Sequence, residues 1–354
     1  MPGDGNNGGT GVVIIDGSQG EGGGQIFRTA LTLAMCTGKA VTIENIRAGR
    51  KKPGLLRQHL ACLKAASAVC NAQVDGDALG SRRVVFRPGA VIAGHYRFAV
   101  GSAGSTALVF QTVFLPLALA GGSSELYLEG GTHNAMAPSV DFIAHSFLPV
   151  LAAVGWQAEV SLERHGFYPS GGGAWCVRIS PAQQIRFLEL LVPGELTRKC
   201  AIATSANIPA HVIERELEYV KKKCYWNDNE LVRQIVSSPG QGNIVSVRLH
   251  MENTSAVFEA VGERNLTAER VAGRAVKAMK NYLHSGAAVC SHLADQLLLP
   301  LVLGCGGKFS TMAPTEHLRT NIAVITQMLP ATILLQPMDD GAWYVDVAPS
   351  QTPV

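Results

Sequence analysis

The chain has 354 residues, a length that allows two or three domains with a large buried core. Hydrophobic residues make up 47% and charged residues 16%, which is typical of a globular protein and excludes a disordered one. The formal net charge of +3 is too small to indicate a nucleic-acid partner by itself, so any such contact requires a local cationic patch.

The N-terminus and the cysteines predict where the protein resides. Residues 1–10, MPGDGNNGGT, contain no basic segment followed by an apolar one, so we expect no secretion. We also expect no membrane span, because no uninterrupted run of 18 apolar residues occurs. The eight cysteines are scattered and form no CxxC pair, as in reduced cytosolic proteins. These features predict a cytoplasmic protein with a flexible tail over residues 1–11. Within that tail, a GxGxxG match at Gly3–Gly8 follows no strand and predicts no dinucleotide site.

Three segments of the chain share one predicted plan of strand, glycine-rich turn, helix and strand. The first spans residues 12–43 and the second residues 97–128, and a shorter third one spans residues 295–311. Each helix ends at a glycine. Each second strand is followed by a proline-containing loop and another helix, with the prolines at Pro53, Pro138 and Pro314.

The spacing of the helix-ending glycines predicts an insertion. The interval from Gly122 to Gly306 exceeds that from Gly38 to Gly121 by about 100 residues. We therefore expect an α/β fold in which three repeats form a main domain and a smaller α/β domain interrupts the third repeat. Chance spacing of the glycines is the alternative. The predicted boundaries are residues 12–184 plus 286–354 for the main domain and 185–285 for the inserted domain.

The predicted inserted domain carries its own structural signals. They are a charged helix over residues 212–222, a glycine-rich hairpin turn over residues 239–242 and a second helix over residues 268–283.

The densest functional signal is the stretch DGSQGEGGGQIFR at residues 16–28. Its glycines let the backbone approach a ligand closely, and the helix that follows offers unpaired N–H groups to an anion. Gln25 and Arg28 would share one face of that helix, and Glu21 could hold a divalent metal ion against phosphate oxygens. A glycine-rich turn with solvated charges is the alternative interpretation.

A cationic segment follows at residues 46–58, IRAGRKKPGLLRQ. It contains five cations and no acidic residue, and the guanidinium group suits phosphate, which favours an anionic substrate over a merely solvated loop.

His317 follows Pro314 in the predicted first turn of a helix whose apolar stripe begins at Leu318. The N-terminus of a helix favours a nearby phosphate and disfavours an imidazolium ion, and both effects would help a neutral imidazole attack phosphorus. The local sequence leaves two interpretations open for His317, a nucleophile or a structural polar residue.

Six spaced motifs together resemble the RNA 3′-terminal phosphate cyclase family. They cover the chain from about residue 12 to residue 347, in order, and are EGGGQIFR, IRAGRKKPGLLRQHL, GSAGSTALVFQT, HGFYPSGGG, ADQLLLP and TEHLRTNIAV. The resemblance implies three βαβαββ-type units with an inserted smaller domain. It also implies an enzyme that uses ATP and a divalent metal ion to convert an RNA 3′-phosphate to a 2′,3′-cyclic phosphate.

The resemblance further implies roles for individual residues. His317 would be the nucleophile that takes up AMP, and Glu21 would be the metal ligand. Four residues would face phosphate or RNA, namely Arg28, Arg47, Arg50 and Gln58. The ATP site would comprise Gln111, Pro138, Phe258, His292, Asp295 and Gln296. The family often places a tyrosine that stacks on adenine at the position of His292, and imidazole offers a smaller stacking area. This difference bears on the strength or selectivity of ATP binding.

Other functions fit the sequence less well. Cyclase-like ribosome-assembly factors share the fold but lack the nucleophilic histidine, so His317 with Glu21 favours an enzyme over such a non-catalytic RNA-processing factor. A metabolite transferase of a related fold would not trap AMP covalently. Neither the KxDG motif of lysine ligases nor a Walker GxxxxGK[ST] sequence is present. Aromatic residues are only 6% and unclustered, which disfavours a pure RNA-binding module. The expected partners are ATP and RNA 3′-phosphate ends, and the sequence predicts no oligomeric state.

Overall fold

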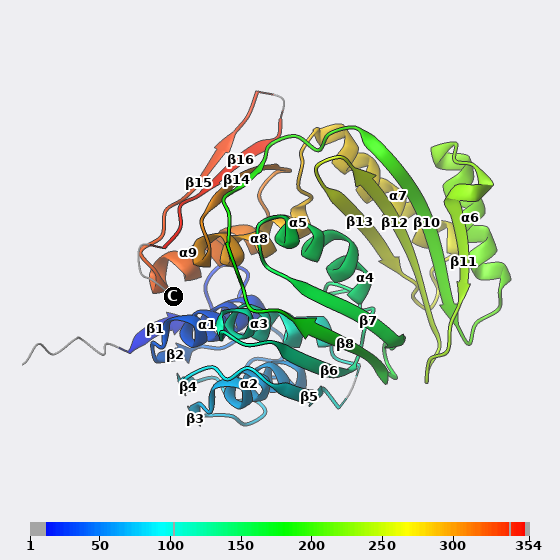
Figure 1. Ribbon diagram of the computed structural model, residues 1–354. Helices are drawn as coiled ribbons and strands as arrows, with labels where there is room; N and C mark the ends of the chain where they lie inside the picture. The colour runs from blue at the N-terminus through cyan, green and yellow to red at the C-terminus, as the bar shows by residue number, and fades with distance from the viewer. Residues whose placement is uncertain (1–11, 102, 340, 351–354) are drawn as a thin grey trace, which may run out of the picture.

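A computed structural model describes residues 12–101, 103–339 and 341–350. The predicted tail at residues 1–11 lies outside this range. The described residues form four four-stranded sheets with helices packed between and around them, a mixed α/β architecture as expected from the sequence (Figure 1). No helix in these ranges is long and apolar enough to cross a membrane.

The first sheet has the strand order β1-β2-β4-β3. The chain runs through β1 (Val13–Asp16), α1 (Gly24–Thr37), β2 (Val41–Glu44), α2 (Arg57–Cys70), β3 (Gln73–Asp75) and β4 (Val84–Arg87). Strands β1 and β2 are parallel and are connected through α1, as a parallel pair requires, whereas β4 is antiparallel to both of its neighbours. Gly38 ends α1 at a φ of 69°, in agreement with the predicted helix stop.

The second sheet repeats this connection pattern in the order β5-β6-β8-β7. Its elements are β5 (His95–Ala99), α3 (Thr106–Leu119), β6 (Ser124–Gly130), α4 (Val140–Phe142), the π-helical turn η1 (Ile143–Phe147), α5 (Leu148–Ala153), β7 (Ala158–Arg164) and β8 (Gly173–Ile179). Again the first two strands are parallel and the fourth is antiparallel to its neighbours.

The third sheet has the order β9-β14-β16-β15, which is the same pattern once more. Its elements are β9 (Leu188–Leu190), α8 (Ser291–Leu303), β14 (Gly307–Thr311), α9 (Glu316–Met328), β15 (Ile333–Pro337) and β16 (Trp343–Val347). β9 pairs in parallel with β14, although about 100 residues separate the two strands in the sequence. The same strand order therefore occurs in three sheets.

The fourth sheet is formed entirely by residues between β9 and α8. It comprises β10 (Leu196–Ala206), α6 (His211–Cys224), η2 (Asp228–Glu230), β11 (Leu231–Ile235), β12 (Gly242–Met251), β13 (Ser255–Val261) and α7 (Ala268–Ser285). Its strand order is β11-β10-β12-β13. Helices α6 and α7 pack against this sheet at the right of the view in Figure 1. The independence of residues 185–285 as a domain stays a prediction, but their first strand, β9, pairs with the third sheet and not with the fourth.

The hairpin predicted over residues 239–242 does not form. Strands β11 and β12 both pair with β10, which lies between them, so the segment that joins them crosses over β10. The glycines serve close packing instead. A Cβ on Gly242 would lie 2.0 Å from the Phe167 ring, and one on Gly240 would lie 2.3 Å from the Ser170 hydroxyl.

Helix α1 lies at the centre of the main core and packs against α2, α3 and α9. Its inner residues include Phe27, Leu31 and Leu33, all at most 1% exposed. Burying such a side chain contributes about 1.5–3 kcal/mol relative to leaving it exposed. Because this burial fixes α1 on three sides, the glycine-rich turn at its N-terminus is held in a defined place against α9.

Candidate active site

His317 lies in the first turn of α9. Thr315 caps this helix, because its hydroxyl accepts a hydrogen bond from the Leu318 N–H at 3.2 Å. Leu318 and Ile325 are buried on the inner face of the helix, whereas the side chain of His317 is 54% exposed. The imidazole is thus accessible on a helix whose position is fixed by its apolar stripe, in agreement with the predicted position beside that stripe.

A chain of hydrogen bonds from three helices determines which nitrogen of His317 carries the proton. Gln25 Nε2 of α1 donates to Asp295 Oδ2 of α8 at 2.9 Å, and Gln25 Oε1 lies 2.8 Å from His317 Nδ1. Since a carboxylate accepts, the amide nitrogen faces Asp295 and the amide oxygen faces the imidazole. An amide oxygen can only accept, so Nδ1 carries the proton in this hydrogen bond. In the neutral ring the lone pair is then on Nε2, which lies 3.4 Å from Glu21 Oε2.

Asp295 and Asn321 hold this chain together. Burial raises the pKa of Asp295, and the hydrogen bond from Gln25 opposes that rise. Asn321, one helical turn after His317, is 3% exposed. Its Nδ2 donates to the Asp295 carbonyl oxygen at 2.7 Å, and its Oδ1 accepts from the Thr29 hydroxyl at 2.7 Å. Asn321 therefore ties α9 to both α8 and α1, which fixes the donors and acceptors around the imidazole.

Glu21 lies beside the other nitrogen of His317. Its Oε2 is 3.4 Å from His317 Nε2 and 3.1 Å from Arg50 Nη2. The glycine-rich turn makes this approach possible. Gly20 has a φ of 54°, a Cβ there would lie 2.2 Å from Thr320 Oγ1, and that hydroxyl accepts from the Glu21 N–H at 3.2 Å. Thr320 lies three residues after His317, and this helical spacing was a signal that the sequence analysis did not use.

The cationic loop contributes Arg50 and Arg47 in different ways. Arg50 Nη2 also donates to the Glu21 carbonyl oxygen at 2.8 Å, so it binds both the backbone and the side chain of that residue. Arg47 Nη1 instead donates to the carbonyl oxygens of Lys52 at 2.5 Å and Gly54 at 3.0 Å. Burial and the neighbouring Arg50 lower the pKa of Arg47. In this structure Arg47 shapes the loop and Arg50 reaches the glycine-rich turn.

Arg28 and His59 lie against the backbone at the start of α1. A Cβ on Gly24 would lie 2.4 Å from His59 Nε2 and 2.8 Å from Arg28 Nη1. Burial, Arg28 and Arg47 lower the pKa of His59 to about 3, so its ring is neutral near pH 7. The Leu56 N–H donates to His59 Nδ1 at 3.2 Å, which places the proton on Nε2. The two side chains thus present donors at a helix N-terminus, where an anion is stabilised. Sequence reasoning assigned no role to His59.

Gln58, Gln111 and Gln296 connect neighbouring elements around this centre. Gln58 Oε1 accepts from the Ser105 N–H at 3.4 Å. Gln111 of α3 donates from Nε2 to Gln296 Oε1 of α8, and Gln296 Nε2 donates to the His292 carbonyl oxygen at 2.5 Å. The imidazole of His292 is exposed in the first turn of α8. Gln111, Gln296 and His292 therefore form one chain of hydrogen bonds next to Asp295.

Pro138 and Phe258 lie outside this hydrogen-bonded cluster. Pro138 immediately precedes Ser139, the residue that caps α4. Phe258 lies in β13 of the fourth sheet, is 6% exposed and packs its ring on Tyr282 of α7 with centroids 5.2 Å apart. The described contacts of Phe258 are thus those of a core residue.

The cluster combines a half-exposed imidazole, whose Nε2 lies 3.4 Å from Glu21 Oε2, with two guanidinium groups and two carboxyl groups. Arg28 and Arg50 oppose Glu21 and Asp295 there, and the N-termini of α1 and α9 add positive dipole ends. No group of three or more His, Cys, Asp or Glu side chains is arranged to hold a metal ion in the part of the chain that the structure describes. A nucleophile surrounded by guanidinium groups and helix N-termini is an arrangement that can act on an anionic electrophile such as a phosphate.

Comparison with known proteins gives two findings. The model of the family described as "RNA 3′-terminal phosphate cyclase" matches residues 19–335, which is nearly the whole chain. Among solved structures, the enolpyruvyl transferase NikO from Streptomyces tendae is similar at 14% sequence identity over 47% of this chain and 33% of that chain. The TM-score of that match is 0.27, so it carries no argument about fold or function.

Proposed function

The chain belongs to the RNA 3′-terminal phosphate cyclase family, and from this premise we propose that it is an active cyclase. In this proposal it uses ATP to convert an RNA 3′-phosphate end to a 2′,3′-cyclic phosphate, through a covalent histidine–AMP intermediate on His317. The observation that carries the proposal is the hydrogen-bonded chain Asp295–Gln25–His317, which leaves Nε2, on the side of Glu21, as the nucleophilic nitrogen of the neutral ring.

The first step is attack of the His317 Nε2 lone pair on the α-phosphorus of ATP. A P–N bond forms, the bond from the α-phosphorus to the bridging oxygen breaks, and pyrophosphate leaves with the electron pair. The imidazole keeps its Nδ1 proton against Gln25 Oε1 and becomes cationic. We call the hydrogen-bonded chain Asp295–Gln25–His317 the relay. Asp295 orients the relay without moving a proton, because Gln25 Nε2 donates to Asp295 throughout.

The next two steps transfer AMP and close the ring. An oxygen of the RNA 3′-phosphate attacks the phosphorus of the bound AMP, and the P–N bond breaks. The cationic imidazole is a good leaving group, because the returning electron pair restores a neutral ring. The ribose 2′-hydroxyl then attacks the RNA phosphate, loses its proton and expels AMP. This closure is intramolecular, where effective molarities reach about 10⁵ M or more, so it needs little help from the protein.

Arg28 and Arg50, with the proposed phosphate contacts Arg47 and Gln58, would neutralise charge on the phosphates. His59 joins this set because its Nε2–H lies beside Arg28 at the N-terminus of α1. Glu21 would hold a divalent metal ion, since a single carboxylate together with substrate phosphate oxygens is a common binding mode of Mg²⁺. Bound there, the ion would supply charge stabilisation to the transferring phosphate. The carboxylate already lies beside Nε2, where the phosphate must arrive.

The adenosine of ATP would lie near the N-terminus of α8. We assign it to Gln111, Gln296, His292 and Asp295, with Pro138 and Phe258 completing the pocket. The chain of hydrogen bonds from Gln111 through Gln296 to the backbone of His292 supports the first part of this assignment. Phe258 requires a contribution from the fourth sheet, where its ring now packs on Tyr282.

The proposal is tested by incubation of the purified protein with α-labelled ATP and Mg²⁺ or Mn²⁺, followed by mass analysis of the denatured chain. We expect a covalent AMP that is acid-labile, alkali-stable and discharged by an RNA with a 3′-phosphate. An RNA with a 3′-hydroxyl should leave the adduct in place. A folded protein that binds RNA 3′ ends but forms no adduct with either metal would instead support the alternative, a non-catalytic cyclase-like RNA-processing factor.

A further inference from the structure

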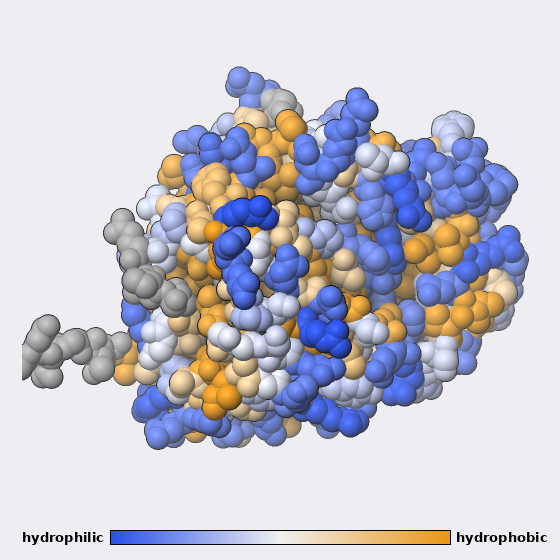
Figure 2. Space-filling view, in the orientation of Figure 1, coloured by the Kyte–Doolittle hydropathy of each residue, from blue (hydrophilic) through white to orange (hydrophobic). Residues whose placement is uncertain are grey.

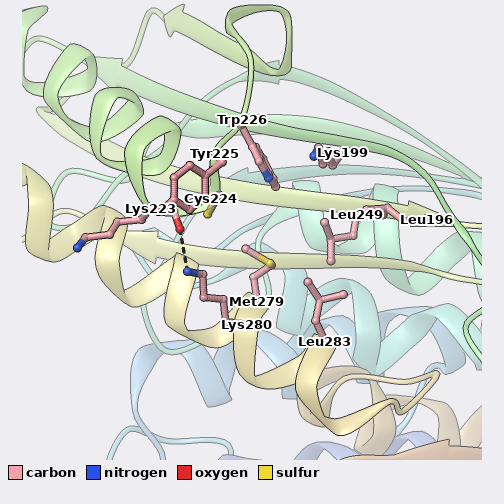
Figure 3. Close-up of a pocket in the computed structure, with 10 residues that line it drawn as sticks. All are labelled: Leu196, Lys199, Lys223, Cys224, Tyr225, Trp226, Leu249, Met279, Lys280 and Leu283. Carbon is pink, nitrogen blue, oxygen red and sulfur yellow. Dashed lines mark hydrogen bonds between the residues drawn. The ribbon is translucent and has the colours of Figure 1, made fainter.

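A cavity of about 310 Å³ opens between the fourth sheet and helices α6 and α7 (Figure 3), and none of its lining residues belongs to the cluster around His317. Its apolar floor contains Leu249 and Met279, which are buried, and its open edge contains Leu196 and Leu283, which are about half exposed. Two adjacent aromatic residues, Tyr225 and Trp226, complete the wall. A volume of this size is at the lower end of small-ligand sites and matches a single planar ring system with its substituents.

Three lysines surround this apolar cavity. They are Lys199 of β10, Lys223 near the end of α6 and Lys280 of α7. Lys199 pairs with Glu230 at 3.5 Å, and Lys280 donates to the Lys223 carbonyl oxygen at 2.8 Å. In the described part of the chain neither Lys223 nor Lys280 forms a salt bridge, so both keep their charge. Lys223 Nζ lies 5.9 Å from the centroid of the Tyr219 ring, and its side chain extends away from the cavity in Figure 3, so a phosphate would meet it at the rim. Because the cavity has no acidic residue in its lining, it suits an anion that carries an apolar or aromatic part.

Tyr225 is placed outward by its backbone. It caps the C-terminus of α6 at a φ of 56°, a conformation in which glycine or asparagine is usual and a bulky residue is uncommon. Its side chain is 91% exposed, whereas the neighbouring Trp226 is 6% exposed and has Lys199 Nζ 5.4 Å from its ring centroid. An exposed aromatic ring beside lysines offers a face on which a planar group can stack.

We propose that this cavity binds a nucleotide of single-stranded RNA, with the base stacked on the exposed ring of Tyr225 and the flanking phosphates on Lys223 and Lys280 at the rim. Stacking on an aromatic ring beside phosphate-binding cations is the general mode of single-strand recognition, and it tolerates any base sequence. The inference rests on the proposed function, because that function is what brings an RNA strand to this protein. We name the cavity and its lysines the base pocket.

The base pocket is close to the proposed nucleotide site along the chain. Lys280 and Leu283 lie in the last two turns of α7, and α8 begins at Ser291, one residue before His292. The Tyr282 hydroxyl donates to the Ala288 carbonyl oxygen at 3.0 Å and so fixes the connection between the two helices. In this proposal an RNA whose 3′ end is at His317 places an upstream nucleotide in the base pocket, so the substrate site extends beyond the reacting end.

The test is the affinity of the full-length protein for a fluorescent single-stranded RNA of about 12 nucleotides, within the usual range of single-strand sites. The informative variant is Tyr225→Asn, because asparagine tolerates the left-handed backbone while the ring is lost. We expect about tenfold weaker binding for Tyr225→Asn, in line with the loss of one stacked base, and near-normal binding for Tyr225→Phe. Equal affinity of Tyr225→Asn and the unaltered protein would overturn the proposal.

The lysines are tested by salt dependence with a matched control. The double variant Lys223→Glu, Lys280→Glu should lower the slope of log affinity against log salt by about 1.4, since each lost phosphate contact on single strands is worth about 0.7. The control is matched to the single variant Lys280→Glu: Lys277→Glu makes the same charge change at an exposed position of α7 that does not line the cavity. It should change the slope by clearly less, and an equal effect of Lys277→Glu would show general charge attraction and overturn the assignment.

These measurements separate the base pocket from the proposed chemistry. Adenylylation by ATP alone should be equal in Tyr225→Asn and the unaltered protein, because the pocket touches neither His317 nor its relay. If no adduct forms but Tyr225→Asn still weakens RNA binding, the proposed activity fails and the base pocket stands. If the adduct forms and RNA binding does not depend on Tyr225, the reverse holds. Binding of anionic lipid vesicles through Tyr225 in place of RNA would also contradict the proposal.

Discussion

The centre around His317 and the base pocket differ in how their parts are held. In the first, side chains from α1, α8 and α9 meet through hydrogen bonds whose partners are separated by 270 or 292 positions in the sequence. Each polar group in these hydrogen bonds has a defined partner. In the second, the apolar floor is packed, but Tyr225 and two lysines remain exposed to solvent. The proposed chemistry at phosphorus would need orientation, for which the relay is suited, whereas the proposed binding of a flexible strand would need only stacking area and charge.

The largest expected effect separates the two regions completely. His317→Ala should lower formation of the AMP adduct and cyclisation by about 10⁴-fold or more, as for the loss of a covalent nucleophile, while affinity for the RNA strand stays unchanged. His95→Ala, at a side chain that is 85% exposed, is the control. We also expect the His317→Ala protein to close an RNA supplied with an adenylated 3′ end. Loss of closure in a folded variant would contradict the assignment of His317 to the first two steps.

Removal of the charge on Asp295 tests the relay itself. In Asp295→Asn, the new amide can donate to Gln25 Oε1, which turns the amide nitrogen of Gln25 toward Nδ1 and favours the wrong tautomer. We expect adduct formation to fall by about 10²–10⁴-fold, the range expected for a misoriented catalytic histidine. The measurement is the single-turnover rate of adenylylation at saturating ATP, compared with Asp75→Asn at an exposed side chain. An unchanged rate would show that the relay does not set the tautomer.

The adenylylation rate should fall at acidic pH, and this fall, the acid limb of the pH profile, tests the same relay without a mutation at the nucleophile. Burial raises the pKa of Asp295 above its ordinary value, so the carboxylate takes up a proton as the pH falls through that raised pKa. Once protonated, Asp295 no longer requires the amide nitrogen of Gln25, and adenylylation should fall by up to about tenfold per pH unit. The sign for stability is opposite: ionisation of this group costs folding free energy above the raised pKa, and protonation relieves that cost.

Asp295→Asn should lower the rate and remove the part of the acid limb that protonation of Asp295 causes, whereas protonation of the nucleophilic imidazole itself would still lower the rate. RNA affinity at the base pocket should not follow the same curve, because its lysines stay charged throughout. A limb that is unchanged in Asp295→Asn would assign it to another group.

The smallest effects concern the glycine-rich turn. Gly20→Ala combines a positive φ with a Cβ 2.2 Å from Thr320 Oγ1, whereas Gly38→Ala has a positive φ and no atom within 4 Å. The positive φ costs about 1–2 kcal/mol of folding free energy in both variants. Because only Gly20→Ala adds the close contact with Thr320, thermal unfolding should show a larger loss of stability for Gly20→Ala. Only Gly20→Ala should also slow adenylylation, because it displaces Glu21 from α9. Equal loss of activity in both variants would show that the contact with Thr320 does not position the turn.

The order of elements could be predicted from the sequence because its signals are local. Apolar strands, helices that end at glycines and prolines before the second helices follow from the conformations of single residues. The contact between Gln25 and Asp295 could not be predicted, since it depends on three helices that meet only in the folded chain. Strand β9 could not be predicted either, because its three residues form a strand only by pairing with β14, which lies far along the sequence.

Predictions for individual residues in the fourth sheet and the candidate active site were also limited where the role of a residue depends on contacts that form only in the folded chain. The glycines at 240 and 242 have turn-like identities but serve close packing against Ser170 and Phe167. Arg47 was grouped with Arg50 by charge, yet its guanidinium is used by two backbone carbonyls of its own loop. His59 was overlooked because its proximity to Arg28 depends on the packing of α2 against α1. The roles given to the ATP-site residues remain predictions for experiment.

The most direct test of the account is identification of the nitrogen that carries AMP. The adduct can be trapped with α-labelled ATP, stabilised at alkaline pH and assigned by fragmentation mass spectrometry and by the phosphorus NMR shift of the linkage. The relay from Asp295 through Gln25 predicts a single adduct on Nε2 of His317. An adduct on Nδ1, or on any other residue, would contradict the claim that the hydrogen-bonded chain selects the nucleophile.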